Sequence, residues 1–218
     1  MTTAVLALQG AFAEHEKMLA ALGEPCVELR DACDLRVPFN RLVLCGGEST
    51  AQRRLLASRG MLGPLRERIE AGMPTLATCA GAILIAERIV DATGGSASAG
   101  EPAGTEEPAA PGEPPARAGE SASPGEPPAL ATFPATAVRN SWGRQLASFH
   151  ATAEFAGIGE VPMTFIRAPH LTDLSDGATA LATVDGRIVA ARAGNQLATA
   201  FHPELDDDPR IHELFCGM

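Results

Sequence analysis

Short apolar runs separated by polar turns predict a series of buried strands in the first part of the chain. Residues 4–8 and 41–45 form the strongest runs, and residues 26–29 form a weaker one. Short runs that are apolar at consecutive positions are typical of strands buried on both faces of a parallel sheet. A fourth run, at 74–78, leads into an apolar segment that begins at Cys79.

Residues at helical spacing fill the intervals between these runs. Phe12, His15, Leu19 and Leu22 fall on one face of a helix, and Gly23 is suited to end it. Strands that alternate with helices at this spacing predict βαβ units and a parallel sheet. The other helices expected here run from a cap at Ser49 or Thr50 to Gly60, through Leu65 and Ile69 to Gly72, and from the turn at Cys79 to about Val90.

The second half of the chain is richer in short strands. Asp185-Gly186 lies between two of them and is a strong hairpin signal. A short helix is expected at 209–216. Together the two halves predict an α/β fold of three layers, flavodoxin-like, in which a mixed, mostly parallel sheet has helices on both faces. The strands expected here cover 137–139, 148–155, 162–166, 178–184, 187–193 and 196–201.

The composition changes between about residue 93 and residue 134. This segment holds more than half of the chain's 17 prolines, together with Gly, Ala, Ser and Glu, and Gly-Glu-Pro occurs at 112–114 and again at 125–127. Such a composition cannot bury enough apolar surface to fold. We therefore expect residues 1–218 to form one domain interrupted by a disordered acidic insertion at about 93–134, with an interaction role as the alternative.

The overall composition excludes several classes of protein. The net charge of −10 argues against general binding to nucleic acids or anionic membranes. No apolar run approaches the ~20 residues needed to cross a bilayer. The 5 cysteines are scattered without a CxxC pair, which fits free thiols in a reducing compartment better than a disulfide framework or a metal site. We expect a soluble, cytoplasmic protein with no resident metal or cofactor.

Cys79 is the first candidate for chemistry. It lies where a buried strand turns abruptly into an apolar helix, with small residues on both sides of it. A nucleophile on such a turn projects above the carboxyl edge of a sheet, beside the first N–H groups of the helix. The alternative is an ordinary buried thiol, because free cysteine is among the most buried residue types.

A histidine and a carboxylate that could serve this cysteine lie far downstream. His202 follows the run at 196–201 and precedes Pro203-Glu204, so we expect it at the sheet edge where Cys79 also lies. His202 would act as acid and base, and Glu204 would orient its ring. A surface turn without chemistry is the alternative for His202 alone, but its coincidence with the cysteine turn favours a triad.

Backbone donors for an oxyanion are available next to Cys79. Gly46-Gly47 follows the run at 41–45, and the Ala80 N–H comes directly after the candidate nucleophile. The alternative is that the two glycines only turn the chain into the next helix.

Several stretches resemble a known family. Thr78-Cys79-Ala80-Gly81 with the distant His202-Pro203-Glu204 is similar to the class I (triad) glutamine amidotransferases. Other stretches resemble, more narrowly, the glutaminase subunits of pyridoxal 5′-phosphate (PLP) synthases, and the likeness covers nearly the whole chain outside the insertion. These stretches are Leu8-Gln9-Gly10-Ala11, Gly46-Gly47-Glu48-Ser49-Thr50, Arg53-Arg54-Leu55, 139–145, 165–170 and 201–205.

The resemblance implies a role for each matching position. Cys79 would be the nucleophile, His202 the acid and base, and Glu204 its partner, with Gly47 and Ala80 as oxyanion donors. Free L-glutamine carries an α-carboxylate, which Arg139 or Arg167 could pair, and an α-ammonium, which needs acceptors such as Glu48. The residues that the resemblance implies for glutamine binding are Gly47, Glu48, Ser49, Arg139, Ile166 and Arg167.

The resemblance also implies a function and a partner. The chain would hydrolyse glutamine to glutamate and ammonia through a cysteine thioester, and pass the ammonia to a separate (β/α)8 synthase subunit that makes PLP. The insertion, together with Ala77 and Cys45 where the family has Gly and Pro, departs from the family pattern. Two alternatives stay open, namely another Cys-His-Glu hydrolase such as a γ-glutamyl peptidase, and a non-catalytic regulatory module of the same fold.

Overall fold

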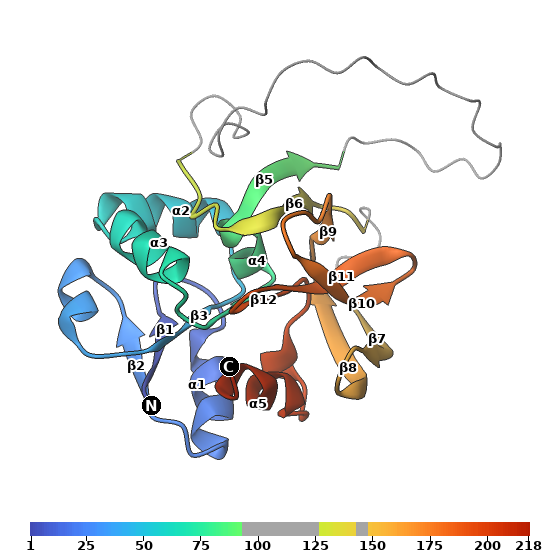
Figure 1. The fold of residues 1–218 in the computed structure, drawn as a ribbon, viewed down its shortest axis with the longest axis horizontal. Helices are drawn as coiled ribbons and strands as arrows, with labels where there is room; N and C mark the ends of the chain where they lie inside the picture. Colours follow the sequence, from blue (N-terminus) through green and yellow to red (C-terminus); the bar gives the residue numbers. More distant parts are fainter. Residues whose placement is uncertain (93–126, 143–147) are drawn as a thin grey trace, which may run out of the picture.

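The computed structural model describes residues 1–92, 127–142 and 148–218 (Figure 1). Within them a mixed sheet has the strand order β2-β1-β3-β4-β12-β11-β9-β6-β5, with β10 paired to β11, and β7 and β8 form a separate hairpin. This is the expected α/β architecture. The strands are Thr3–Leu6 (β1), Cys26–Leu29 (β2), Arg41–Leu44 (β3), Thr75–Thr78 (β4), Ala86–Asp91 (β5), Phe133–Arg139 (β6), Ser148–Phe155 (β7), Gly159–Ile166 (β8), His170–Thr172 (β9), Thr179–Val184 (β10), Arg187–Ala193 (β11) and Gln196–Thr199 (β12).

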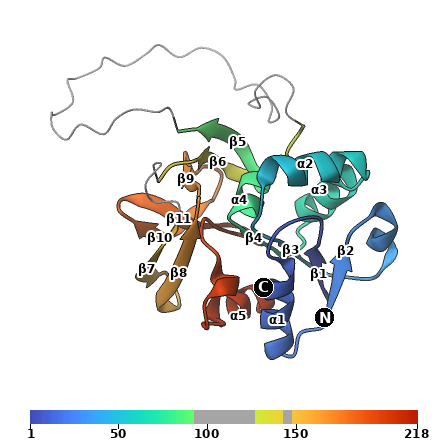
Figure 2. The same ribbon diagram turned by 180° about the vertical axis from the view of Figure 1, so that it is seen from behind.

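Helices cover both faces of the sheet (Figures 1 and 2). Helices α2, α3 and α4 lie on one face, and α1 and α5 lie on the other. Their bounds are Phe12–Ala21 (α1), Ser49–Ser58 (α2), Leu62–Glu70 (α3), Ala80–Ile85 (α4) and Arg210–Cys216 (α5), and short 3₁₀ helices cover Ala32–Arg36 and Pro203–Leu205.

Alternate residues of the central strands serve two separate cores. On β3, Leu42 and Leu44 pack in the core that includes residues of α2 and α3, whereas Val43 packs in the core that includes residues of α1 and α5. Successive side chains of a strand point to opposite faces, so a strand buried on both faces needs apolar residues at every position. This is why the apolar runs predicted these strands.

The register brings the ends of two distant strands together. β4 lies parallel to β12, and Thr78, the last residue of β4, pairs with Thr199, the last residue of β12. The residues that follow them, Cys79 and the segment leading to His202, therefore leave the sheet at the same edge. The site is thus assembled because β4 and β12, which are far apart in the sequence, are parallel neighbours in the sheet.

The helix after Cys79 is shorter than predicted. It ends at Ile85, and Ala86–Asp91 forms strand β5 instead of continuing the helix to Val90. Leu130 N–H and Thr132 N–H donate to the carbonyls of Leu84 and Ile85, each at 2.8 Å, so a distant segment takes the acceptors of the last turn. Pairing with β6 then outweighs the local preference for helix.

Two further details of the secondary structure differ from the prediction, and one is confirmed. The cap of α2 is Glu48, whose carboxylate accepts from Thr50 N–H and Ala51 N–H, and not Ser49 or Thr50. Strand β9 has only three residues and was not predicted. The hairpin at Asp185-Gly186 is confirmed, since it joins the antiparallel strands β10 and β11.

The expected insertion at about 93–134 lies mostly outside the described residues. Its last part is described, and there Leu130 and Phe133 are fully buried. The packed chain therefore resumes before residue 135, because residues expected to be in the insertion contribute to the core.

Candidate active site

Cys79 lies on a strained turn between β4 and α4. Its φ and ψ are 47° and −101°, a backbone conformation that residues with a side chain rarely adopt. Its N–H donates to the Thr199 carbonyl at 2.8 Å, which ties the turn to the end of β12. A Cβ at Gly81 would lie 2.1 Å from the Leu44 carbonyl oxygen, so only glycine lets α4 start this close to β3. Packing on both sides thus enforces the predicted turn.

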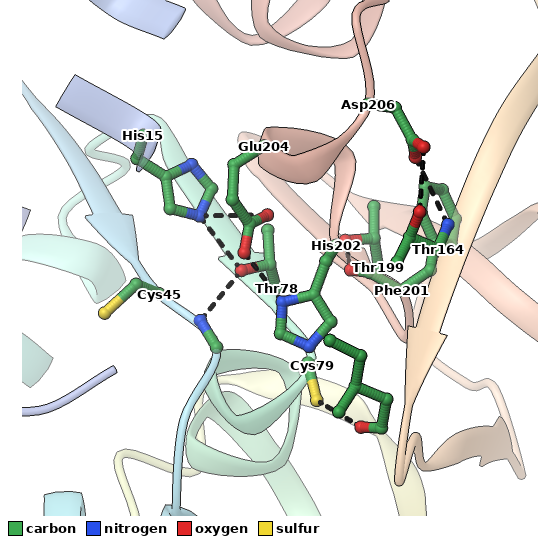
Figure 3. Close-up of polar contacts among 12 residues, drawn as sticks. His15, Cys45, Thr78, Cys79, Thr164, Thr199, Phe201, His202, Glu204 and Asp206 are labelled. Carbon is green, nitrogen blue, oxygen red and sulfur yellow. Dashed lines mark hydrogen bonds and ion pairs between the residues drawn. The ribbon is translucent and has the colours of Figure 1, made fainter. Parts of the chain in front are cut away.

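His202 lies beside Cys79, and Glu204 lies behind the His202 ring (Figure 3). His202 Nδ1 is 2.7 Å from Glu204 Oε1. The Cys79 thiol lies next to the His202 ring and donates to the Ile166 carbonyl at 3.8 Å. The His202 N–H donates to the Thr164 carbonyl at 2.8 Å, which fixes the backbone that carries the ring. Cysteine, imidazole and carboxylate are therefore placed in the order of a nucleophile, a base and its orienting partner.

Charge favours a protonated His202. Burial lowers the pKa of His202, but hydrogen bonds to Cys79 and Glu204 and the charges of both groups outweigh burial and raise the pKa to about 10. Burial likewise raises the pKa of Glu204, but the nearby His15 and His202 outweigh it and hold that pKa below its ordinary value. The pair is therefore an imidazolium and a carboxylate at neutral pH.

This ion pair predicts a pH-dependent stability. An unfolded histidine titrates near pH 6.5, whereas His202 in the folded protein keeps its proton to about pH 10. The stabilisation is therefore complete below about pH 6.5 and is lost as the pH rises toward 10. We expect the Tm to fall between about pH 6.5 and 9 by several degrees, and to fall less in His202→Asn, as measured by circular dichroism. Parallel curves for the two proteins would contradict the ion pair.

A cavity of about 430 Å³ opens in front of Cys79. Every residue predicted to bind glutamine lines it, and so do the predicted oxyanion donors. Glu204 lies behind His202 and does not line it. The lining residues are Gln9, Gly47, Glu48, Ser49, Cys79, Ala80, Ile83, Asp91, Arg139, Asn140, Ile166, Arg167 and His202.

Two charged residues of the cavity already have partners. The Arg139 guanidinium donates two hydrogen bonds to Asp91, from Nε to Oδ1 at 2.9 Å and from Nη2 to Oδ2 at 2.7 Å. The Glu48 carboxylate caps α2. The expected role of Glu48 as an acceptor for an ammonium therefore competes with its role as a cap.

Several residues that shape the site were not assigned by the sequence. Gln9 Oε1 accepts from the Glu48 N–H at 2.7 Å and so holds the loop after β3. His15 Nε2 is 3.3 Å from Glu204 Oε2, and Thr78 Oγ1 accepts from the Gly46 N–H at 3.0 Å. For His15, the signal available in the sequence was its position on the apolar face of a predicted helix.

Among the described residues, no group of three or more His, Cys, Asp or Glu side chains could hold a metal ion.

Solved structures identify the class of the fold. A crystal structure described as a glutamine amidotransferase superposes with a TM-score of 0.79 and 34% identity, covering 99% of this chain and 97% of that chain. A mostly parallel sheet with helices on both faces and a cysteine turn at its edge is the class I glutamine amidotransferase fold, as predicted.

Sequence comparisons narrow the class to a family. The model of the SNO glutamine amidotransferase family matches residues 5–94 and 123–218. A protein of Desulfitobacterium hafniense (strain Y51) named pyridoxal 5′-phosphate synthase subunit PdxT is 44% identical over 99% of this chain and 92% of its own length. A protein of Methanocorpusculum labreanum with the same name is 44% identical over 100% and 97%. This chain belongs to the SNO glutamine amidotransferase family.

No helix among the described residues is long and apolar enough to span a membrane.

Proposed function

We propose that this chain is the glutaminase subunit of a PLP synthase and that Cys79, His202 and Glu204 carry out the hydrolysis of L-glutamine to L-glutamate and ammonia. The observation that supports this assignment most directly is that Cys79 and His202 both line a cavity of about 430 Å³, while Glu204 holds the His202 ring at 2.7 Å from behind. Membership of the SNO family and the relatives named PdxT support the same activity.

The first half of the proposed reaction forms a thioester. The Cys79 thiolate, stabilised by the neighbouring imidazolium, attacks the side-chain amide carbon of glutamine. The negative charge on the amide oxygen is then stabilised by the N–H groups of Gly47 and Ala80. His202 gives its proton to the departing nitrogen, so the C–N bond breaks and ammonia leaves the γ-glutamyl thioester.

The second half releases the product. His202, now neutral, accepts a proton from a water molecule that attacks the thioester carbon. The C–S bond breaks, glutamate leaves, and the imidazolium and thiolate are restored. Glu204 stays ionised throughout and stabilises the charged ring.

Glutamine recognition is proposed to centre on Arg139. Arg139 lines the cavity, and Asp91 holds its guanidinium through two hydrogen bonds and so fixes the orientation of a group that can pair with the α-carboxylate. Ile166 and Arg167, together with the loop of Gly47, Glu48 and Ser49, line the same cavity and complete the proposed binding site. The fixed orientation of its guanidinium supports Arg139, rather than Arg167, as the proposed partner of the carboxylate.

Arg139→Gln should therefore raise the KM for glutamine by about 10-fold or more and change kcat much less, because a charge-assisted hydrogen bond contributes about 1.5–3 kcal/mol. Steady-state glutamate release measures both constants. Arg167→Gln is the matched comparison at the same cavity. A larger rise of KM in Arg167→Gln than in Arg139→Gln would reverse the assignment.

The ammonia is proposed to pass directly to a synthase subunit. Free ammonia is mostly ammonium at neutral pH and is then not a nucleophile, so release into solvent would waste it.

We also propose a cytoplasmic location, because all 5 cysteines are free thiols. A single amidotransferase domain with an inserted segment is the organisation we propose, and the family model leaves residues 95–122 unmatched.

The test is glutamate and ammonia release from L-glutamine by the full chain, alone and with its synthase subunit. Equal amounts of both products, released fastest in the complex, are expected. Faster cleavage of γ-glutamyl peptides than of free glutamine would instead indicate a peptidase. Release in neither condition would indicate a non-catalytic module.

A further inference from the structure

Two buried histidines lie behind the proposed triad and have no part in the reaction as written. His15 of α1 and His212 of α5 are both fully buried. His15 Nδ1 is 2.9 Å from His212 Nε2, and His15 Nε2 is 3.3 Å from Glu204 Oε2. The two rings therefore extend the chain of contacts beyond Glu204 to α1 and α5. Figure 3 shows the contact between His15 and Glu204.

The second oxygen of Glu204 needs this neighbour. The Glu204 side chain has no exposed surface, and its Oε1 is used by His202. Oε2 is buried without a hydrogen bond of good geometry, and His15 Nε2, at 3.3 Å, is the polar neighbour found for it among the described residues. A buried carboxylate oxygen that loses such a neighbour is costly to keep charged.

The contacts favour one arrangement of the protons. The Glu204 carboxylate only accepts, and the Thr78 hydroxyl can also accept at 3.1 Å, so a proton on His15 Nε2 suits both neighbours. Burial lowers the pKa of His15, so this ring is neutral and its Nδ1 is an acceptor. His212 must then donate from Nε2, which leaves its Nδ1 as a bare acceptor. That atom is indeed buried without a partner, and burial lowers the pKa of His212 to about 3.

His15 Nε2 also contacts the strand that leads to Cys79. His15 Nε2 is 3.1 Å from Thr78 Oγ1, and this hydroxyl accepts from the Gly46 N–H at 3.0 Å. Thr78 is the residue before Cys79, and Gly46 precedes the proposed oxyanion donor Gly47. His15 is therefore the point where the carboxylate, the cysteine strand and the glycine loop meet.

We propose that His15, oriented by His212, is a positioning residue that holds Glu204 ionised and directed at His202. The proposal rests on the proposed function, since it assumes that Glu204 serves the reaction. His15 itself touches neither the cavity nor the substrate. The charged or titratable groups that face it are Glu204, His202, His212 and, on its own helix, Glu14.

The proposal is tested with His15→Leu and His15→Gln, assayed as the full chain with its synthase subunit. Leucine removes the donor, so kcat should fall by about 10- to 100-fold with little change in KM. The acidic limb of kcat against pH should move to higher pH, because Glu204 becomes harder to ionise. Glutamine can place an amide N–H where the imidazole Nε2–H lies, and it should recover most of the loss.

Leu19→Ala is the matched structural control. Leu19 is a fully buried residue of the same helix and is not part of the polar network. This variant should lower the Tm at least as much as His15→Leu while leaving the pH profile unchanged. In a Glu204→Gln background, His15→Leu should have little further effect on kcat. An unshifted profile in His15→Leu, or additive losses in the double variant, would overturn the positioning role.

A parallel assay of Cys79→Ala separates this proposal from the function on which it rests. If Cys79→Ala is inactive while His15→Leu behaves as wild type, only the positioning role fails. If Cys79→Ala keeps its activity, the proposed reaction itself fails.

Discussion

Cys79→Ala is expected to lower kcat for glutamine hydrolysis by at least about 10³-fold, because losing the nucleophile of a triad leaves only binding and oxyanion stabilisation. Alanine keeps the Cβ and hence the strained backbone at φ 47°, so the Tm should change little. The loss would therefore reflect chemistry rather than unfolding. Glutamate release in the presence of the synthase subunit measures it.

Cys33→Ala is the matched control for this substitution. Cys33 is also a free thiol, but it is exposed and lies on the 3₁₀ helix Ala32–Arg36, away from the cavity. Its replacement should leave kcat within a factor of about two, as for surface substitutions far from a site. A thioester trapped from glutamine and detected by mass spectrometry should be present in wild type and Cys33→Ala, and absent in Cys79→Ala. Its persistence in Cys79→Ala would exclude Cys79 as the nucleophile.

Local patterns were sufficient to predict the reactive turn. The four residues of the strand before Cys79 are small or apolar enough to be buried throughout, and small residues follow it, so both the strand and the sharp turn could be expected from the sequence. His202 could be placed at the same edge because it follows another apolar run. The pairing of Thr78 with Thr199 then confirmed that the two strands are neighbours. Parallel strands that end together bring their following residues together wherever these lie in the chain.

Long-range packing decided what the sequence could not show. Helical spacing placed His15 on a buried face, but its partner His212 is 197 residues away on α5. The Asp91–Arg139 pair depends on β5 being a strand, because the parallel register then sets these two residues opposite each other. A helix continued to Val90, as the local pattern predicted, would not have formed that pair.

Gly46 illustrates the same limit. The sequence allowed Gly46-Gly47 to be a simple turn or part of an oxyanion site. In the structure, a Cβ at Gly46 would lie 2.2 Å from His202 Cε1 and 2.8 Å from His202 Nδ1. Gly46 is not among the residues with positive φ, so backbone strain does not require glycine here. Glycine is required here because the proposed catalytic imidazole of His202 occupies the space of a side chain.

Gly46→Ala should therefore lower kcat by about 100-fold or more while the chain stays folded. The methyl group can be accommodated only if the His202 ring moves, and a displacement of about 1 Å at a reacting group costs about that factor. Because Glu204 holds Nδ1 at 2.7 Å, the ring cannot move without breaking the ion pair. The rise in the pKa of His202 should then be partly lost, which NMR titration of the imidazole measures independently of activity.

Gly63→Ala separates this effect from the general cost of replacing a glycine. A Cβ at Gly63 of α3 meets no atom within 4 Å, and alanine is the better helix former, so the Tm should rise slightly and kcat should not change. Wild-type kcat and an unshifted His202 titration in Gly46→Ala would mean that the imidazole does not act from the position seen here. If instead kcat falls in Gly46→Ala alone, and the imidazole titrates at lower pH, then Gly46 is glycine because His202 occupies the space of its side chain.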